Sequence, residues 1–240
     1  MKKFTTAFAA LATLLAIPTA LPAEEAIQPL KKDDRLVFLG DSITAAAVRP
    51  QGFITLVTKS IETTHPDLGI ETFGAGISGN KVPNLQKRLE KDVLAKKPTI
   101  VFIYIGINDV WHWKKNKEGK MAGGTPKEIF ESGLKEIIGK INDAGARVIL
   151  CTPSVIGEMA AGENDRDEML EEYSAISRKV AADTDSQLVD LRKAFLDHLK
   201  ENNPDNVRKG ILTGDGVHLN PAGNAFVAKE MGKAIGITVD

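Results

Sequence analysis

Ser42 and His218 are the two residues that could cooperate in nucleophilic chemistry. Ser42 follows a short apolar run and precedes a predicted helix, where free N–H groups favour developing negative charge. Asp215 lies three residues before His218, so its carboxylate could hold Nδ1 of the imidazole and leave Nε2 free as a base. Structural explanations also exist: Asp41 or Ser42 could cap a helix, and Asp215 could hold a histidine at the start of one.

Two further residues could stabilise an oxyanion beside such a serine. The side-chain amide of Asn108 can donate a hydrogen bond, and Gly79 can offer a backbone N–H that no side chain obstructs. Both positions also fit ordinary turns, in which Asn is common and Gly supplies a positive φ. Taken one at a time, these residues fit a structural role as well as a catalytic one.

The elements that must position these residues alternate between short apolar runs and longer amphipathic stretches. This alternation predicts one α/β domain with a five-stranded parallel sheet between two layers of helices. The predicted strands are residues 35–39, 70–73, 99–105, 147–150 and 187–191. The predicted helices are residues 51–64, 82–96, 126–144, 166–184, 191–201 and 221–235, and Leu134, Ile137, Ile138 and Ile141 have the spacing of one apolar helix face.

Polar and glycine-rich segments follow the predicted strands, where ligands bind in parallel sheets. These segments contain Ser42, Gly79 and Asn108 after the first three strands in the chain. Because the carboxyl ends of parallel strands meet at one edge of a sheet, we expect these residues to lie close together. Their common position supports a catalytic site more strongly than any one motif does.

Four segments of the chain, in this order, resemble the sequence blocks of the SGNH hydrolases, also known as GDSL-type esterases and lipases. They are Gly40-Asp41-Ser42-Ile43-Thr44, Gly76-Ile77-Ser78-Gly79, Gly106-Ile107-Asn108-Asp109 and Asp215-Gly216-Val217-His218-Leu219-Asn220. The resemblance spans about residues 35–235 and implies the flavodoxin-like three-layer α/β/α fold of that family. One departure is that Ala45-Ala46-Ala47 stands where family members often have a glycine, which makes the turn after Ser42 more helical.

The resemblance also implies a serine esterase that needs no metal and no organic cofactor. It implies a catalytic triad of Ser42, Asp215 and His218. The implied oxyanion hole consists of the N–H groups of Ser42 and Gly79 and the side chain of Asn108. The reaction would be hydrolysis of a carboxylic ester through an acyl-enzyme on Ser42.

Two loops at the same edge are candidates for the substrate pocket. The loop at residues 111–125 contains both tryptophans, and we predict Trp111 and Trp113 as substrate-binding residues. We also predict that Asp41, beside the nucleophile, contacts the substrate. The loop at residues 154–166 is either a mobile cover or an ordinary surface connection. No large apolar lid is visible, so we predict short acyl esters, such as acetyl esters, of carbohydrates or small alcohols.

Three alternatives remain open. A lysophospholipase or thioesterase could use the same triad on other acyl substrates. A metal-dependent phosphoesterase would need more His or Asp ligands than four histidines and these motifs offer. A carbohydrate-binding module without activity would have no need for Ser42, Asp215 and His218 together.

The N-terminus predicts export. Two lysines precede the uncharged residues 4–17, and small residues around Ala23 fit a signal peptide of residues 1–23, although a retained N-terminal anchor is possible. Residues 24–240 form the predicted hydrolase domain of a periplasmic or extracellular protein without stable membrane association. The only cysteine, Cys151, follows an apolar run and is expected to be a buried small hydrophobe. A net charge of −1 gives no reason to expect nucleic acid as a partner, and the sequence leaves the oligomeric state open.

Overall fold

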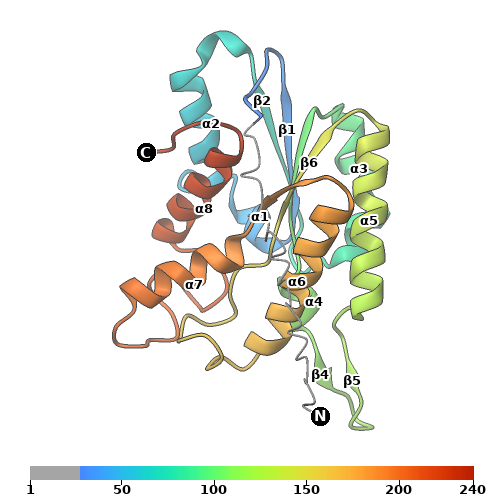
Figure 1. The fold of residues 1–240 in the computed structure, drawn as a ribbon, viewed down its shortest axis with the longest axis vertical. Helices are drawn as coiled ribbons and strands as arrows, with labels where there is room; N and C mark the ends of the chain where they lie inside the picture. Colours follow the sequence, from blue (N-terminus) through green and yellow to red (C-terminus); the bar gives the residue numbers. More distant parts are fainter. Residues whose placement is uncertain (1–27) are drawn as a thin grey trace, which may run out of the picture.

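Five parallel strands form the central sheet, in the order β2-β1-β3-β6-β7 (Figure 1). The computed structural model describes residues 28–240, so the predicted signal peptide lies outside the described residues. The strands are β1 (Arg35–Gly40), β2 (Glu71–Gly76), β3 (Ile100–Tyr104), β6 (Arg147–Cys151) and β7 (Gln187–Val189). The predicted five-stranded parallel sheet is confirmed.

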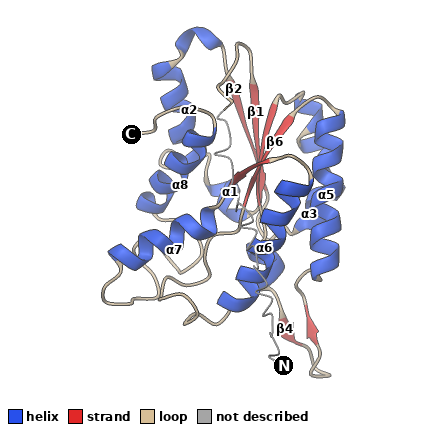
Figure 2. Cartoon of the chain, viewed as in Figure 1, coloured by secondary structure: helices blue, strands red, loops and turns tan. Residues whose placement is uncertain are grey.

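Helices cover both faces of this sheet (Figure 2). One face carries α2 (Phe53–Thr64), α7 (Leu191–Asn202) and α8 (Pro221–Ala234), and the other carries α3 (Val82–Asp92), α5 (Lys127–Asp143) and α6 (Asp167–Asp183). The short helices α1 (Ser42–Ala46) and α4 (Ile107–Trp111) follow β1 and β3 directly. The predicted three-layer α/β/α architecture is therefore confirmed. None of the helices in residues 28–240 is long and apolar enough to cross a membrane.

Some predicted boundaries were wrong for local reasons. The second strand runs to Gly76, beyond the predicted end at residue 73, because it pairs with β1 along its whole length. The last strand ends at Val189, since the carboxylate of Asp190 caps the N-terminus of α7 by accepting from the Lys193 N–H. The helix predicted at 82–96 ends at Asp92, and a single 3-10 turn (Leu94–Lys96) follows.

The core lies between the sheet and the two helix layers. All five residues of β3 are buried, and the rings of Phe38 and Phe102 stack across β1 and β3 with centroids 4.8 Å apart. The predicted apolar face of α5 is completely buried, as expected. Cys151 is also completely buried, and this burial raises the pKa of its thiol. The prediction that Cys151 serves as a small core hydrophobe is confirmed.

The two loops predicted near the substrate pocket differ in structure. Residues 111–125 contain a short antiparallel hairpin of β4 (Lys114–Lys115) and β5 (Met121–Ala122). Residues 154–166 form no helix or strand, but the buried side chain of Glu158 within them bonds to the segment that precedes His218. Both loops follow the carboxyl ends of strands, on the same edge as Ser42.

Candidate active site

Ser42, His218 and Asp215 form a continuous chain of hydrogen bonds. Ser42 Oγ lies 2.9 Å from His218 Nε2, and His218 Nδ1 lies 2.7 Å from Asp215 Oδ2. Ser42 and His218 are 176 residues apart in sequence, so the fold alone brings them together. At this distance Nε2 can accept the hydroxyl proton while the carboxylate holds the ring.

The turn that carries Asp215 and His218 is held by its own backbone. Asp215 Oδ1 accepts hydrogen bonds from the N–H groups of Val217 at 2.9 Å and His218 at 2.7 Å. Partial burial favours the neutral carboxyl, but hydrogen bonds from the ring and backbone of His218 outweigh it and lower the pKa of Asp215. Asp215 is therefore ionised at neutral pH and oriented to stabilise a protonated imidazole.

Ser42 is placed at the N-terminus of α1 by the end of β1. Asp41 is the N-cap residue of α1, and its Oδ1 accepts from the Ile43 N–H at 2.9 Å. As the first residue of the helix, Ser42 has an N–H without an acceptor within the helix. The helical capping role that the sequence left open thus belongs to Asp41, and the Ser42 hydroxyl points to His218 instead.

The predicted oxyanion donors lie beside Ser42. Asn108 is buried at the start of α4, and its Nδ2 donates to Asp41 Oδ2 at 3.2 Å and to the Asn80 carbonyl at 3.1 Å. These bonds join Asn108 to the residue before Ser42 and to the residue after Gly79. Gly79 has a φ of +76°, and a Cβ added there would meet no atom within 4 Å. The positive φ therefore explains the glycine, since the space beside its Cα would admit a side chain.

Arg88 stabilises the turn that contains Gly79. This role of Arg88 was not predicted from the sequence. Its guanidinium donates to the Gly40 carbonyl at 2.8 Å, the Ala75 carbonyl at 2.9 Å and Asn80 Oδ1 at 2.8 Å. These acceptors lie at the carboxyl ends of β1 and β2 and in the turn. Arg88 lies on α3, so its position relative to the site depends on how that helix packs against the sheet. No local sequence motif indicates this packing.

Two buried carboxylic acids lie beneath the site. Burial raises the pKa of Asp41 to about 7; the Ile43 N–H opposes this shift, and the charge of Asp109 adds to it. Burial likewise raises the pKa of Asp109 to about 6, although the Val82 N–H donates to its Oδ1 at 3.1 Å. Asp41 is 2% exposed and bonds to Asn108. Asp41 thus lies behind the predicted oxyanion donors.

The two tryptophans have different surroundings. Trp111 is 41% exposed, and its ring packs edge-on against His218 with centroids 6.2 Å apart. It lines an open cavity of about 440 Å³ with His112, Lys114 and Gly123. Trp113 instead packs over Gly124, and its Nε1 lies 3.4 Å from the hydroxyl of Tyr173. Trp111 therefore borders the site directly, whereas Trp113 fixes the loop to α6.

Metal-ligating side chains do not gather near the triad. Within residues 28–240, no group of three or more His, Cys, Asp or Glu side chains is arranged to hold a metal ion. His65, at the end of α2, and His198, on α7, are half-buried and lie on other parts of the domain.

The family model for GDSL-like lipases and acylhydrolases matches residues 38–226 of this chain. Among curated proteins, an acetylxylan esterase of Geobacillus stearothermophilus is 32% identical over 222 residues, which cover 85% of this chain and 94% of that protein. An uncharacterized lipoprotein of Bacillus subtilis is 28% identical and covers 66% of this chain and 70% of its own length.

Solved structures of acetylxylan esterases have the same fold. One of them, AlAXEase, is 44% identical with a TM-score of 0.78, over 84% of this chain and 99% of that one. The Geobacillus stearothermophilus enzyme is 31% identical with a TM-score of 0.74, over 86% and 95%. Its catalytic mutants replace a serine, an aspartate and a histidine three residues after that aspartate, which is the spacing of Asp215 and His218. This chain belongs to the GDSL-like lipase/acylhydrolase family and is a carboxylic ester hydrolase of the SGNH type.

Proposed function

We propose that this protein is an exported esterase that removes acetyl groups from carbohydrate through an acyl-enzyme on Ser42. The observation that carries the proposal is the hydrogen-bond chain from Ser42 Oγ to His218 Nε2 and from His218 Nδ1 to Asp215. It supplies a nucleophile, a base and a carboxylate that orients the base, at distances suited to proton transfer. The similarity to acetylxylan esterases supports the acetyl group and the carbohydrate.

The first half of the reaction forms the acyl-enzyme. Ser42 Oγ attacks the ester carbonyl carbon as His218 Nε2 takes the hydroxyl proton, and the ionised Asp215 stabilises the imidazolium. The carbonyl oxygen becomes an oxyanion that the N–H groups of Ser42 and Gly79 and the amide of Asn108 stabilise. His218 then gives its proton to the departing sugar oxygen, and the acetyl group remains on Ser42.

The second half releases acetate. Water takes the place of the sugar, His218 removes its proton, and the hydroxide attacks the acetyl carbonyl. The same donors hold the second oxyanion until the bond to Ser42 Oγ breaks and His218 returns the proton. No step requires a metal or an organic cofactor.

The sugar portion of the substrate is proposed to lie against Trp111. The exposed indole borders His218, and the open cavity beside it is lined by Trp111, His112, Lys114 and Gly123. An aromatic face suits the apolar face of a sugar ring, and the polar neighbours suit its hydroxyls. Asp41 is buried and bonded to Asn108, so we assign it to the support of the oxyanion donors rather than to contact with the sugar.

A comparison of substrates tests this function. We expect acetate release from acetylated xylo-oligosaccharides, and a rate on p-nitrophenyl acetate that falls as the acyl chain lengthens. Ser42→Ala should abolish both activities without changing the unfolding midpoint. A preference for long acyl chains would instead support a lysophospholipase or thioesterase.

Export has its own test. The secreted or periplasmic fraction of the source cell should contain a mature chain that begins at Glu24, as cleavage after Ala23 predicts. A chain that keeps residues 1–23 and sediments with membranes would show that this segment is an anchor.

A further inference from the structure

Glu158 carries a completely buried carboxylate that the proposed mechanism does not use. Its Oε1 accepts hydrogen bonds from the N–H groups of Leu212 at 2.7 Å and Thr213 at 2.5 Å, and from the Thr213 hydroxyl at 2.8 Å. Its Oε2 accepts from the Ile211 N–H at 2.8 Å. All four donors are neutral, and three are consecutive backbone N–H groups. Such a cluster of donors is a site for an anion, which here is a side chain from a distant loop.

The segment that Glu158 holds leads into the turn with the catalytic histidine. The Thr213 hydroxyl, which donates to Glu158, accepts from the Gly216 N–H at 3.1 Å. The Gly214 N–H donates to the His218 carbonyl at 2.9 Å and closes the turn. Residues 213–218 therefore form one hydrogen-bonded turn, and the carboxylate of Glu158 binds its first residue, Thr213.

The backbone of Gly157 and Glu158 also bonds to residues 208–216, the segment that leads into the histidine turn. The Gly157 N–H donates to the Gly216 carbonyl at 2.7 Å, and the Glu158 N–H donates to the Arg208 carbonyl at 2.8 Å. Gly157 has a φ of +97°, a conformation that side chains disfavour. The loop thus contacts the histidine turn through both its main chain and its side chain.

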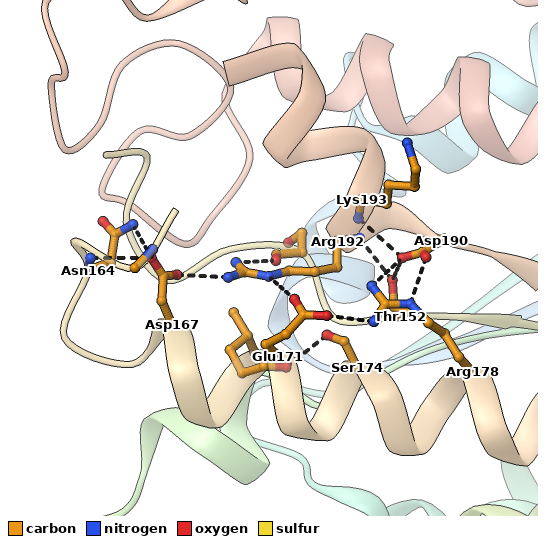
Figure 3. A network of polar contacts seen from close by, with 12 residues as sticks. Thr152, Asn164, Asp167, Glu171, Ser174, Arg178, Asp190, Arg192 and Lys193 are labelled. Atoms are coloured by element: carbon orange, nitrogen blue, oxygen red, sulfur yellow. Dashed lines mark hydrogen bonds and ion pairs between the residues drawn. The ribbon is translucent and has the colours of Figure 1, made fainter. Parts of the chain in front are cut away.

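A buried ion pair anchors this loop to the body of the domain (Figure 3). Asn164 bonds to the backbone of Met159 and donates to Asp167 Oδ2 at 2.8 Å. Asp167 Oδ1 lies 2.9 Å from Arg192 Nη2, and the two side chains are 3% and 2% exposed. Arg192 also donates to the Ser154 carbonyl at 3.3 Å. The loop is therefore fixed on both sides of Glu158, by residues of α6 and α7.

We infer that Glu158 is a positioning residue for the general base. Its carboxylate holds residues 211–213, and through them it sets the position of His218 relative to Ser42. Asp215 and His218 lie on the same turn and move together, so their mutual bond does not depend on Glu158. The contact that depends on it is the 2.9 Å contact between Ser42 Oγ and His218 Nε2.

This dependence predicts a loss in kcat rather than in substrate binding. A displacement of about 1 Å in a catalytic group costs on the order of a hundredfold in rate. The cavity at Trp111 is lined by Trp111, His112, Lys114 and Gly123, whereas the hydrogen bonds of Glu158 go to residues 203–213. KM should therefore stay near the wild-type value. The inference rests on the proposed function, because it assigns His218 as the base.

The first test compares two changes from glutamate to glutamine in the same loop. Glu158→Gln removes the charge and places an amide N–H₂ against backbone donors, whereas Glu163→Gln makes the same change at an exposed side chain. On p-nitrophenyl acetate, we expect Glu158→Gln to lower kcat by about 10- to 100-fold, in line with a displaced base, and to leave KM within about threefold. Glu163→Gln should behave as wild type.

A second pair tests the link through Thr213 without changing a charge. Thr213→Val keeps the shape but removes the hydroxyl that joins Glu158 to the Gly216 N–H, and Thr213→Ser keeps that hydroxyl. We expect kcat to fall by about 3- to 10-fold in Thr213→Val, since one of the four bonds is lost, and to recover in Thr213→Ser. This pair remains informative if Glu158→Gln does not fold.

Loss of stability is separated from loss of positioning by a core variant. Ile138→Val alters a completely buried residue of α5 and should lower the unfolding midpoint without lowering kcat at temperatures where it is folded. We expect a low-field proton resonance from the 2.7 Å His218–Asp215 hydrogen bond in the wild type, and we expect it to persist in folded Glu158→Gln. Wild-type kcat in Glu158→Gln and Thr213→Val, or a loss in proportion to the unfolded fraction, would overturn the inference. An inactive wild-type protein would instead overturn the proposed function on which it rests.

Discussion

Asn108 donates its side-chain amide to the carboxylate of Asp41 across 3.2 Å, and both side chains are buried directly behind Ser42. The same nitrogen donates to the Asn80 carbonyl at 3.1 Å. Both hydrogens of the amide therefore have acceptors before substrate binds, and the amide is oriented in advance. A developing oxyanion must share one of these hydrogens, which ties the proposed oxyanion hole to Asp41 and Asn80.

Removal of the Asn108 amide should slow the reaction without preventing binding. We expect Asn108→Ala to lower kcat by about 10²- to 10³-fold, because one donor to an oxyanion contributes about 2.7–4 kcal/mol to the transition state. Steady-state kinetics on p-nitrophenyl acetate measure this. Asn142→Ala, at an exposed position on α5, is the control and should match the wild type. An Asn108→Ala protein with wild-type kcat would remove Asn108 from the oxyanion hole.

Asp41 should make the folded protein less stable as the pH rises. Burial raises its pKa from 3.8 to about 7, so between these values the folded state binds more protons than the unfolded state. The free energy of unfolding therefore falls with increasing pH across about pH 4–7, and Asp109, with a pKa of about 6, acts in the same direction. Asp215 has a lowered pKa and contributes stability that is lost only below this range.

Substitution of Asp41 measures its contribution to the fall in the free energy of unfolding with rising pH. Asp41→Asn should flatten the dependence between about pH 4 and 7, because an amide at this position does not titrate. Urea unfolding at pH 5 to 8 measures the difference between the variant and the wild type. Equal slopes for the two proteins would contradict the raised pKa of Asp41.

The sequence predicted the parts of this site that depend on local patterns. Ser42 and Asn108 each follow a strand whose apolar pattern is clear, and parallel strands must bring their carboxyl ends to one edge. Asp215 and His218 are close in sequence, so their bond follows from spacing. The strands and helices were predicted by the same local patterns, with errors at ends such as Val189, where a side chain caps the next helix.

The supporting residues could not be predicted in this way. Glu158 bonds to residues 53 to 55 positions away, and Arg88 bonds to Gly40 at 48 positions. A glutamate in a glycine-containing loop and an arginine on an amphipathic helix have the types expected of exposed positions. Their burial depends on tertiary packing alone. The different surroundings of Trp111 and Trp113 could not be predicted either, because the hairpin that follows them has no strong strand pattern.

Trp111 should affect the sugar more than the chemistry. We expect Trp111→Ala to raise KM for acetylated xylo-oligosaccharides by about tenfold, which corresponds to about 1.4 kcal/mol, and to change kcat on p-nitrophenyl acetate by less than about threefold. Trp113→Ala should instead lower the unfolding midpoint, since Trp113 packs over Gly124 and reaches Tyr173. An unchanged KM for the oligosaccharide in Trp111→Ala would place the sugar elsewhere.

Chelation should leave the activity unchanged. The proposed reaction uses only side chains and backbone of the chain, and residues 28–240 contain no group of His, Cys, Asp and Glu arranged to hold a metal ion. Prolonged dialysis against EDTA, followed by assay of acetate release, tests this expectation. Loss of activity that returns with a divalent cation would favour a metal-dependent esterase.

Direct detection of the acyl-enzyme on Ser42 would establish the proposed mechanism. The wild-type protein is mixed with p-nitrophenyl acetate, quenched in acid within the first turnovers, digested and analysed by mass spectrometry. We predict an acetyl group on the Ser42 hydroxyl that disappears when the substrate is exhausted, and no acetylated peptide and no turnover in Ser42→Ala. Turnover by Ser42→Ala, or a transient acetyl group on another residue, would contradict it.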